Sequence, residues 1–197
     1  MGHLETRRQL VHMSGIAVPF YIRWAYPRGG ILLPAVTFLL IVALGCLVAE
    51  GYKKGMRIPV IAELVDLTER PESIHSPGRG AFQFFLGSLA ALLLFRSDIG
   101  IACASIAVLA FGDSFSTLFG KSFGTHKLPH NPVKSWEGTM AGAFFAFLGA
   151  STQIALPLAL VGAAAGMLAE SLPWRVDDNL TVPIAAGAAM FLASPYL

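Results

Sequence analysis

A run of 19 apolar residues, ILLPAVTFLLIVALGCLVA at 31–49, is long enough for one helix to cross a lipid bilayer. Six further apolar segments are shorter and lie at 9–25, 81–95, 99–112, 139–151, 154–169 and 181–195. Only 13% of the 197 residues are charged, against about 25% in ordinary soluble domains, so lipid is the expected solvent. We therefore predict an all-α fold, a polytopic transmembrane bundle of about seven helices that forms a single domain over 1–197.

Two short polar connections predict helical hairpins within this bundle. Arg96–Asp98 separates the third apolar segment from the fourth, and residues 151–153 separate the fifth from the sixth. Small residues recur every four positions along two later segments, which lets helix backbones approach closely in lipid. These residues are Gly138, Gly142 and Ala146, and then Gly162 and Gly166. Cys46 and Cys103 both lie in apolar runs, so neither a disulfide nor a zinc site is expected.

The charges are divided unequally between the two sides that seven spans would create. Eleven Lys and Arg residues lie on the side of the N-terminus and of the loops 50–80, 113–138 and 170–180, and three lie on the other side. Lys and Arg favour cytoplasmic loops, so we expect a multi-pass protein of the cell membrane with a cytoplasmic N-terminus. Eleven of the twelve acidic residues lie on that side too, although the positive-inside rule does not sort acids. Either the three loops form an active site that faces the cytoplasm, or long loops simply hold more charge.

The loop 113–138 has the composition that a nucleoside triphosphate and its metal ion require. Lysines supply positive charge to phosphate oxygens, glycines let backbone N–H groups approach them, and carboxylates hold Mg²⁺. The basic and glycine residues in question are Gly120, Lys121, Gly124, Lys127 and Lys134. Asp113 follows an apolar segment and Glu137 begins the next one, so we expect the two carboxylates to face each other across the loop as metal ligands. Asp113 could instead serve as general base or as a helix cap.

A second acidic cluster, Asp177, Asp178 and Asn179, precedes the last apolar segment. Two adjacent carboxylates beside Asn favour a metal or nucleotide role, although an N-cap is the simpler alternative. Whether Glu170 joins this cluster is left open. Net charge is only +2, so no nucleic-acid partner is expected.

Other polar residues are candidates for phosphate or nucleotide contacts. Lys134 and Ser135 are expected to touch phosphate, whereas Lys121 and Lys127 would serve either phosphate or anionic lipid headgroups. Arg8 and His12 are four residues apart and share one face of a helix. His12 lies in an apolar segment, where an ionisable residue is either functional or a bonded core residue. His75, His126 and His130 have no helical metal-ligand spacing, and zinc is not expected.

Three motifs in order resemble the membrane CTP-dependent lipid kinases: dolichol kinase, phytol kinase and the CTP-dependent diacylglycerol kinase. The motifs are RRQLVHMSG at 7–15, GDSFSTLFGKSFGTHKL with NPVKSWEGT between 112 and 139, and ESLPWRVDDNLTVP at 170–183. Phosphatidate cytidylyltransferase carries a run similar to the second motif. Its further C-terminal signature is absent here, so the kinases are favoured and a cytidylyltransferase remains the alternative. A small transporter or scaffold is less favoured, since a transporter should place ionisable residues near the bilayer midplane and this chain has almost none deep in its spans.

The resemblance implies phosphoryl transfer from CTP, with Mg²⁺, to the hydroxyl of a membrane lipid alcohol. Polyprenol or dolichol, a phytol-like isoprenol and diacylglycerol all stay open as acceptors, and a homodimer is compatible with the sequence. The expected catalytic residues are Asp113, Lys134, Glu137, Asp177 and Asp178, with Mg²⁺ held by Asp113, Glu137 and Asp177 or Asp178. The expected nucleotide contacts are Arg8, His12, Gly120, Lys121, Gly124, Lys127, Lys134, Ser135 and Asn179.

Overall fold

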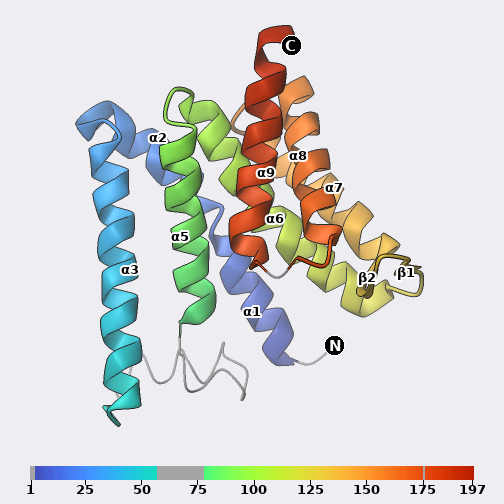
Figure 1. Ribbon diagram of the computed structural model, residues 1–197, viewed down its shortest axis with the longest axis horizontal. Helices are drawn as coiled ribbons and strands as arrows, with labels where there is room; N and C mark the ends of the chain where they lie inside the picture. The colour runs from blue at the N-terminus through green and yellow to red at the C-terminus, as the bar shows by residue number, and fades with distance from the viewer. Residues whose placement is uncertain (1–2, 57–77, 175) are drawn as a thin grey trace.

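The computed structural model describes residues 3–56, 78–174 and 176–197, with side chains from residue 7 onward (Figure 1). The helices are α1 (His3–Ser14), α2 (Ala17–Gly29), α3 (Leu32–Lys53), α5 (Arg79–Leu94), α6 (Ile99–Phe123), α7 (Trp136–Ser151), α8 (Leu156–Ser171), α9 (Asp178–Ala193) and the 3-10 turn η2 (Ser194–Tyr196). A two-stranded antiparallel hairpin, β1 (Lys127–Leu128) and β2 (Asn131–Ser135), joins α6 to α7. The all-α prediction is confirmed apart from this hairpin. Residues 57–77 of the predicted loop 50–80, with His75, and Arg175 lie outside the described residues.

Helix α6 is the central element of the bundle. It packs against α1, α2, α5, α7, α8 and α9, and every residue from Ile101 to Ala110 is buried. Alanine, serine and cysteine make up half or more of that stretch, so neighbouring helices can approach its backbone on all sides. Functional side chains on α6 are therefore positioned by a helix that packs against most of the other helices.

Helix α3 has the opposite character and lies at the edge of the bundle (Figure 1). It packs against α2 and α5 and leaves a long apolar surface exposed, including Leu40, Leu44 and Leu47. By length and composition, α3 and α6 are the two described helices that could cross a membrane; α3 is mostly exposed and α6 mostly buried.

The first apolar segment, predicted as one helix over 9–25, is two helices that meet at Gly15. Pro19 has no backbone N–H to donate to the carbonyl of residue 15, so a continuous helix would lose that bond. Gly15 also allows close packing, since a Cβ there would lie 2.5 Å from Cζ of Phe84 on α5. The break lets α1 turn toward the end of the bundle where charges gather.

The predicted helical hairpins are confirmed. Residues 95–98 join α5 to α6, and Asp98 caps α6 by accepting a hydrogen bond of 3.1 Å from the N–H of Ile101. The small residues pack as expected: a Cβ on Gly142 would lie 2.5 Å from Cε of Met167, and one on Gly166 would lie 2.5 Å from Cγ1 of Val108. Cys46 and Cys103 are free thiols.

Helix α6 continues ten residues beyond Asp113, where the sequence had predicted a loop to begin. Phenylalanines four residues apart form a ladder on one side of this extension. They are Phe111, Phe115, Phe119 and Phe123. Phe115 also stacks on Phe145 of α7, with ring centroids 3.5 Å apart. Asp113 is thus a mid-helix residue, and the loop that follows α6 begins only after Phe123.

Candidate active site

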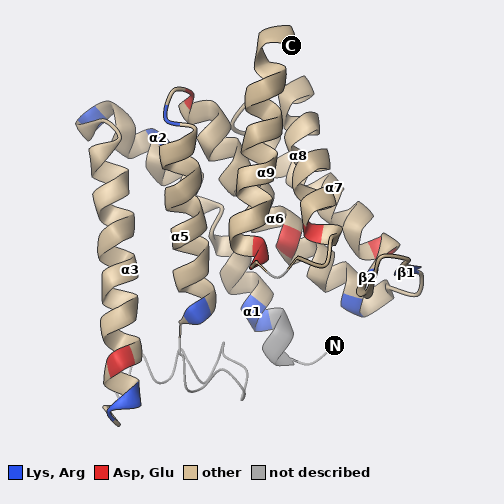
Figure 2. Ribbon diagram, viewed as in Figure 1, with Lys and Arg blue, Asp and Glu red and all other residues tan. Residues whose placement is uncertain are grey.

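Most of the predicted site residues line one polar pocket of about 460 Å³. The pocket lies where the second half of α6, the hairpin and the ends of α8 and α9 converge. Eleven of the thirteen candidates line it: Arg8, Asp113, Gly120, Lys121, Gly124, Lys127, Lys134, Ser135, Asp177, Asp178 and Asn179. Figure 2 shows acidic residues close together where α6, α8 and α9 meet, and a smaller group of charged residues at the opposite end of the bundle.

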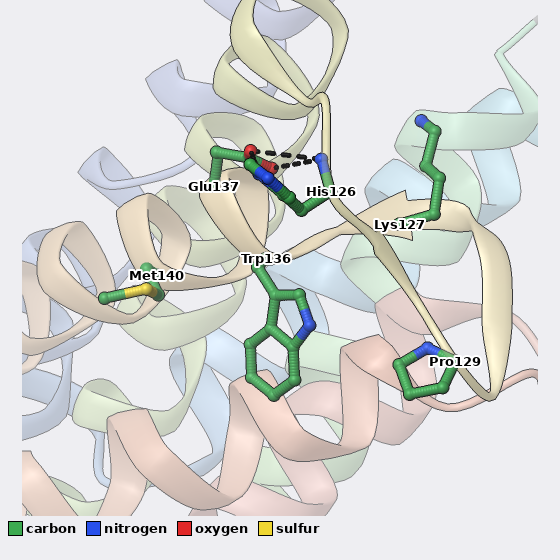
Figure 3. Close-up of a pocket in the computed structure, with 6 residues that line it drawn as sticks. All are labelled: His126, Lys127, Pro129, Trp136, Glu137 and Met140. Atoms are coloured by element: carbon green, nitrogen blue, oxygen red, sulfur yellow. Dashed lines mark hydrogen bonds and ion pairs between the residues drawn. The ribbon is translucent and has the colours of Figure 1, made fainter.

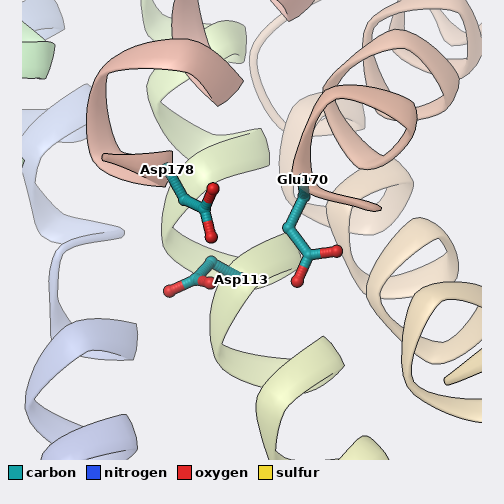
Figure 4. Close-up of side chains that lie close together, drawn as sticks. All are labelled: Asp113, Glu170 and Asp178. Atoms are coloured by element: carbon teal, nitrogen blue, oxygen red, sulfur yellow. The ribbon is translucent and has the colours of Figure 1, made fainter. Parts of the chain in front are cut away.

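Three carboxylates from three helices meet in this pocket (Figure 4). Asp113 of α6, Glu170 of α8 and Asp178 of α9 can each offer an oxygen within 4.8 Å of the other two. Glu170 is fully buried, whereas the two aspartates are partly buried. Glu170 is thereby part of the acidic cluster, a question the sequence had left open.

Lys134 is the cation of the cluster. Its Nζ donates a hydrogen bond to Oε1 of Glu170 and another, of 3.3 Å, to Oδ2 of Asp178. Burial opposes the charge on Lys134, but Glu170 and the two aspartates outweigh it and raise the pKa of this lysine. Burial also raises the pKa of Asp178, Lys134 lowers it, and Asp113 adds to the rise. Lys134 is thus bonded to two of the three carboxylates, and the charge of Asp113 adds to the rise in its pKa.

Glu170 has one paired and one unpaired carboxylate oxygen. Its Oε1 accepts hydrogen bonds from Lys134 and, at 2.7 Å, from Ser116 Oγ, while its Oε2 is buried without a hydrogen-bond partner. An unsatisfied buried carboxylate oxygen is costly unless something else occupies the site. Oxygen ligands on three elements, with a spare buried oxygen among them, suit a hard divalent cation.

Helix α1 completes the wall beside Asp113. His12 Nε2 lies 3.5 Å from Oδ2 of Asp113, and the His12 ring packs edge-on against Phe84. Arg8, one turn earlier, lines the pocket itself. The shared helix face predicted for these two residues therefore points to the site, but His12 contacts a carboxylate of the cluster and does not line the pocket.

Two predicted ligands serve as helix caps. Ser135 Oγ accepts a hydrogen bond of 3.2 Å from the N–H of Gly138 at the start of α7. Asp177 Oδ1 accepts bonds from the backbone N–H and side-chain Nδ2 of Asn179, at 3.0 and 2.8 Å. Both caps border the pocket. Asp177 lies outside the three-carboxylate cluster, and its metal role stays a prediction.

Glycines allow the pocket walls to meet. A Cβ on Gly138 would lie 2.6 Å from the carbonyl oxygen of Ser116, and one on Gly124 would lie 2.5 Å from Ser135 Oγ. Ser116, Thr117 and Thr139 also line the pocket and were not predicted. Ser116 and Thr117 are three and four residues after Asp113, so the helical spacing was a usable signal once α6 is known to continue.

Glu137 does not face Asp113, contrary to the prediction. Its carboxylate accepts hydrogen bonds from Thr125 Oγ1 and His126 and lines a second pocket, of about 780 Å³ (Figure 3). Gly138 packs closely against Ser116 and Gly120 of α6, whereas Glu137 is bonded to Thr125 and His126 at the entry to the hairpin. This pocket is larger but mostly apolar, with Pro129, Trp136 and Met140 in its wall.

Comparisons with known proteins agree with the motifs. No family model and no solved structure matches the chain. Curated relatives include "Phytol kinase 1, chloroplastic" of Arabidopsis thaliana, 26% identical over 72% of this chain and 52% of that protein. "Probable phytol kinase 1, chloroplastic" of Oryza sativa subsp. japonica is 31% identical over 72% and 51%, and "Farnesol kinase, chloroplastic" of Arabidopsis thaliana is 29% identical over 94% and 64%.

The chain spans about half the length of the phytol kinases that it matches and somewhat more of the farnesol kinase. The aligned part includes most or nearly all of this chain, so the similarity is not confined to one motif. The resemblance is therefore confirmed: over most of its length, the chain is similar to proteins named phytol kinase and farnesol kinase.

Proposed function

We propose that the protein transfers the γ-phosphoryl group of a nucleoside triphosphate to the hydroxyl of a membrane isoprenoid alcohol. The observation that carries this proposal is the cluster of Asp113, Glu170 and Asp178 beside Lys134, with a buried, unpaired oxygen on Glu170, at the wall of a lysine-lined pocket. The names of the relatives, phytol kinase and farnesol kinase, favour an isoprenoid alcohol over diacylglycerol. CTP is the proposed donor because the three sequence motifs resemble those of CTP-dependent kinases.

The donor set fits Mg²⁺, which would neutralise charge on the donor phosphates when bound. Asp113, Glu170 and Asp178 would hold it, so Glu170 takes the place that the sequence had assigned to Glu137. Lys134 is held in place by two of these carboxylates. Arg8, Lys121 and Lys127, which border the same pocket, would bind phosphate oxygens.

Asp113 is assigned as the residue that accepts the proton of the acceptor hydroxyl. Glu170 and Asp178 are both bonded to Lys134, whereas Asp113 contacts His12. The alcohol oxygen forms a bond to the γ-phosphorus, the bond from that phosphorus to the β-phosphate bridging oxygen breaks, and the hydroxyl proton passes to Asp113. A nucleoside diphosphate and a lipid monophosphate are the products. Positioning and charge neutralisation provide most of the catalysis in such transfers.

We further propose that a bilayer surrounds α3 and the apolar part of the bundle. The long exposed apolar face of α3 and the collection of charges at one end of the molecule support this placement (Figure 2). The positive-inside count favours a cytoplasmic pocket. The relatives are named as chloroplastic, so their names do not favour the cell membrane.

A two-label assay on purified protein in lipid nanodiscs tests the function. Farnesol, geranylgeraniol, phytol, a polyprenol and diacylglycerol are offered with γ-labelled or α-labelled CTP, and with γ-labelled ATP for comparison. We expect the γ-label to enter an isoprenoid phosphate and the α-label to remain in CDP. Entry of the α-label into lipid with release of pyrophosphate would show a cytidylyltransferase. Transfer from ATP at a rate equal to that from CTP would contradict the donor.

A further inference from the structure

We propose that Glu137 is a positioning residue, which fastens the β1–β2 hairpin to the start of α7 and so places Lys134, and that it is not a ligand of the metal. The inference deepens the proposed function and rests on it for its kinetic consequence.

The contacts of Glu137 converge from the segment that enters the hairpin (Figure 3). Its Oε1 accepts hydrogen bonds from Thr125 Oγ1 at 2.7 Å, from His126 N–H at 3.1 Å and from His126 Nδ1 at 2.7 Å. Its Oε2 lies 3.3 Å from the same His126 N–H. The backbone N–H of Trp136 donates a bond of 2.9 Å to the carbonyl of His126, so the junction is tied through main chain and side chain.

The carboxylate of Glu137 is already occupied by these donors. The Thr125 hydroxyl and then His126 hold the pKa of Glu137 well below its usual range, so it is ionised throughout the physiological range. Glu137 also stands apart from the carboxylates of Asp113, Glu170 and Asp178, whose oxygens lie within 4.8 Å of one another. A metal ion held by that cluster would not need Glu137.

The hairpin carries the lysines of the pocket, one on each strand. Lys127 is in β1, and Lys134 is in β2, one residue before the cap of α7. Lys127 pairs in register with Ser135, so a shift of β1 is passed to the strand that holds Lys134. A misplacement of about 1 Å in a reacting site can cost about a hundredfold in rate. Fastening the entry to β1 therefore fixes the ammonium group between Glu170 and Asp178.

Kinetics of three variants separate fastening from metal binding. We expect Glu137→Ala to raise the donor KM about tenfold while the half-saturating Mg²⁺ concentration stays within twofold of wild type. Glu137→Gln keeps an acceptor oxygen and should recover most of that loss. Asp178→Asn, which removes a cluster carboxylate, should raise the half-saturating Mg²⁺ concentration at least tenfold. An equal rise in Glu137→Ala would overturn the proposal.

Amide hydrogen exchange provides a readout that does not depend on activity. Residues 125–135 should exchange faster in Glu137→Ala than in wild type, with Thr125→Val intermediate because it removes one donor. Glu50→Ala is the matched control, since Glu50 pairs with Lys53 and Lys54 at the end of α3. If residues 125–135 exchange in Glu137→Ala as they do in wild type, Glu137 does not fasten the hairpin. A wild-type protein without kinase activity would instead count against the proposed function, and the exchange result would still decide this one.

Discussion

The two ends of the bundle differ in how fully their polar groups are hydrogen-bonded. At one end, Arg23, Asp98 and Gln153 surround Gly100, and each is bonded within the fold. Arg23 donates to the side chain and backbone of Gln153, and Asp98 caps α6. At the other end, Glu170 Oε2 is buried without a hydrogen-bond partner.

Thr139 Oγ1 and Asn179 Oδ1 are buried without hydrogen-bond partners too, and all three residues line the polar pocket. Buried polar atoms are normally paired, because an unpaired one costs about 1–3 kcal/mol. The polar groups around Gly100 are bonded to one another and to the backbone, so this satisfied end of the bundle stabilises the fold. The unpaired polar atoms at the other end line the pocket and are available to a ligand. Substitutions at the two ends should separate stability from activity.

The largest effect is expected at Asp113. Asp113→Asn should abolish phosphoryl transfer, by thousands-fold as an order of magnitude, because a carboxylate that serves both metal and acceptor is lost. Initial rates of the γ-label assay measure it, with size-exclusion profiles as the check on folding. Asp98→Asn makes the same chemical change at the satisfied end and should keep activity. A folded Asp113→Asn protein whose initial rate is within tenfold of the wild-type rate would show that Asp113 is not an active-site residue.

The ion pair in the pocket should show a smaller but clear effect on stability. Lys134→Met leaves the buried Glu170 carboxylate uncompensated, which should lower the free energy of unfolding by about 3 kcal/mol. Adding Glu170→Gln should restore most of the stability and none of the activity. Denaturant unfolding of the single and double variants measures the coupling. Additive losses would mean that the two side chains do not act as a pair.

A milder loss is expected at the satisfied end. Arg23→Met removes hydrogen bonds to Gln153, and because Arg23 is exposed it should cost only about 1 kcal/mol. The γ-label assay should give a rate within twofold of wild type. A strong fall in activity without unfolding would contradict the division between the two ends.

The smallest effect concerns pH. The pKa of Glu137 is lowered by the hydrogen bonds from Thr125 and His126, so its contribution to stability is present above the unfolded pKa of about 4.3 and is lost as pH falls toward the folded value. The difference in melting temperature between wild type and Glu137→Gln should therefore narrow as the pH falls below about 4.3. A difference that widens on acidification would reverse the assignment.

The sequence predicted most of the site because the motifs themselves supply it. Hydropathy placed the later helices within a few residues, and short polar connections marked their turns. The first segment was harder, since its break depends on how Gly15 packs against Phe84. The extent of α6 was also missed, because Gly112 and Asp113 read locally as a helix end while the phenylalanine ladder extends the helix.

The rotation of each helix about its axis decides which carboxylates come together. A linear motif does not show this rotation. Asp177 and Asp178 are adjacent, yet the first caps α9 and the second reaches Lys134. Glu170 lies 57 residues after Asp113, and the two come together only when α8 packs on α6. Glu137 is near Asp113 in the motif but belongs to the other face of the hairpin.

The continuation of α6 beyond Asp113 separates the three carboxylates from the C-terminal end of this helix. Ten residues of helix correspond to about 15 Å along the axis of α6. In the proposed membrane placement, an isoprenoid alcohol meets the carboxylates without being drawn out of the lipid. Each methylene that stays buried saves about 0.8 kcal/mol of transfer free energy. A short water-soluble alcohol would gain nothing from this burial, so the proposed membrane placement would favour long apolar acceptors before any side chain recognises them.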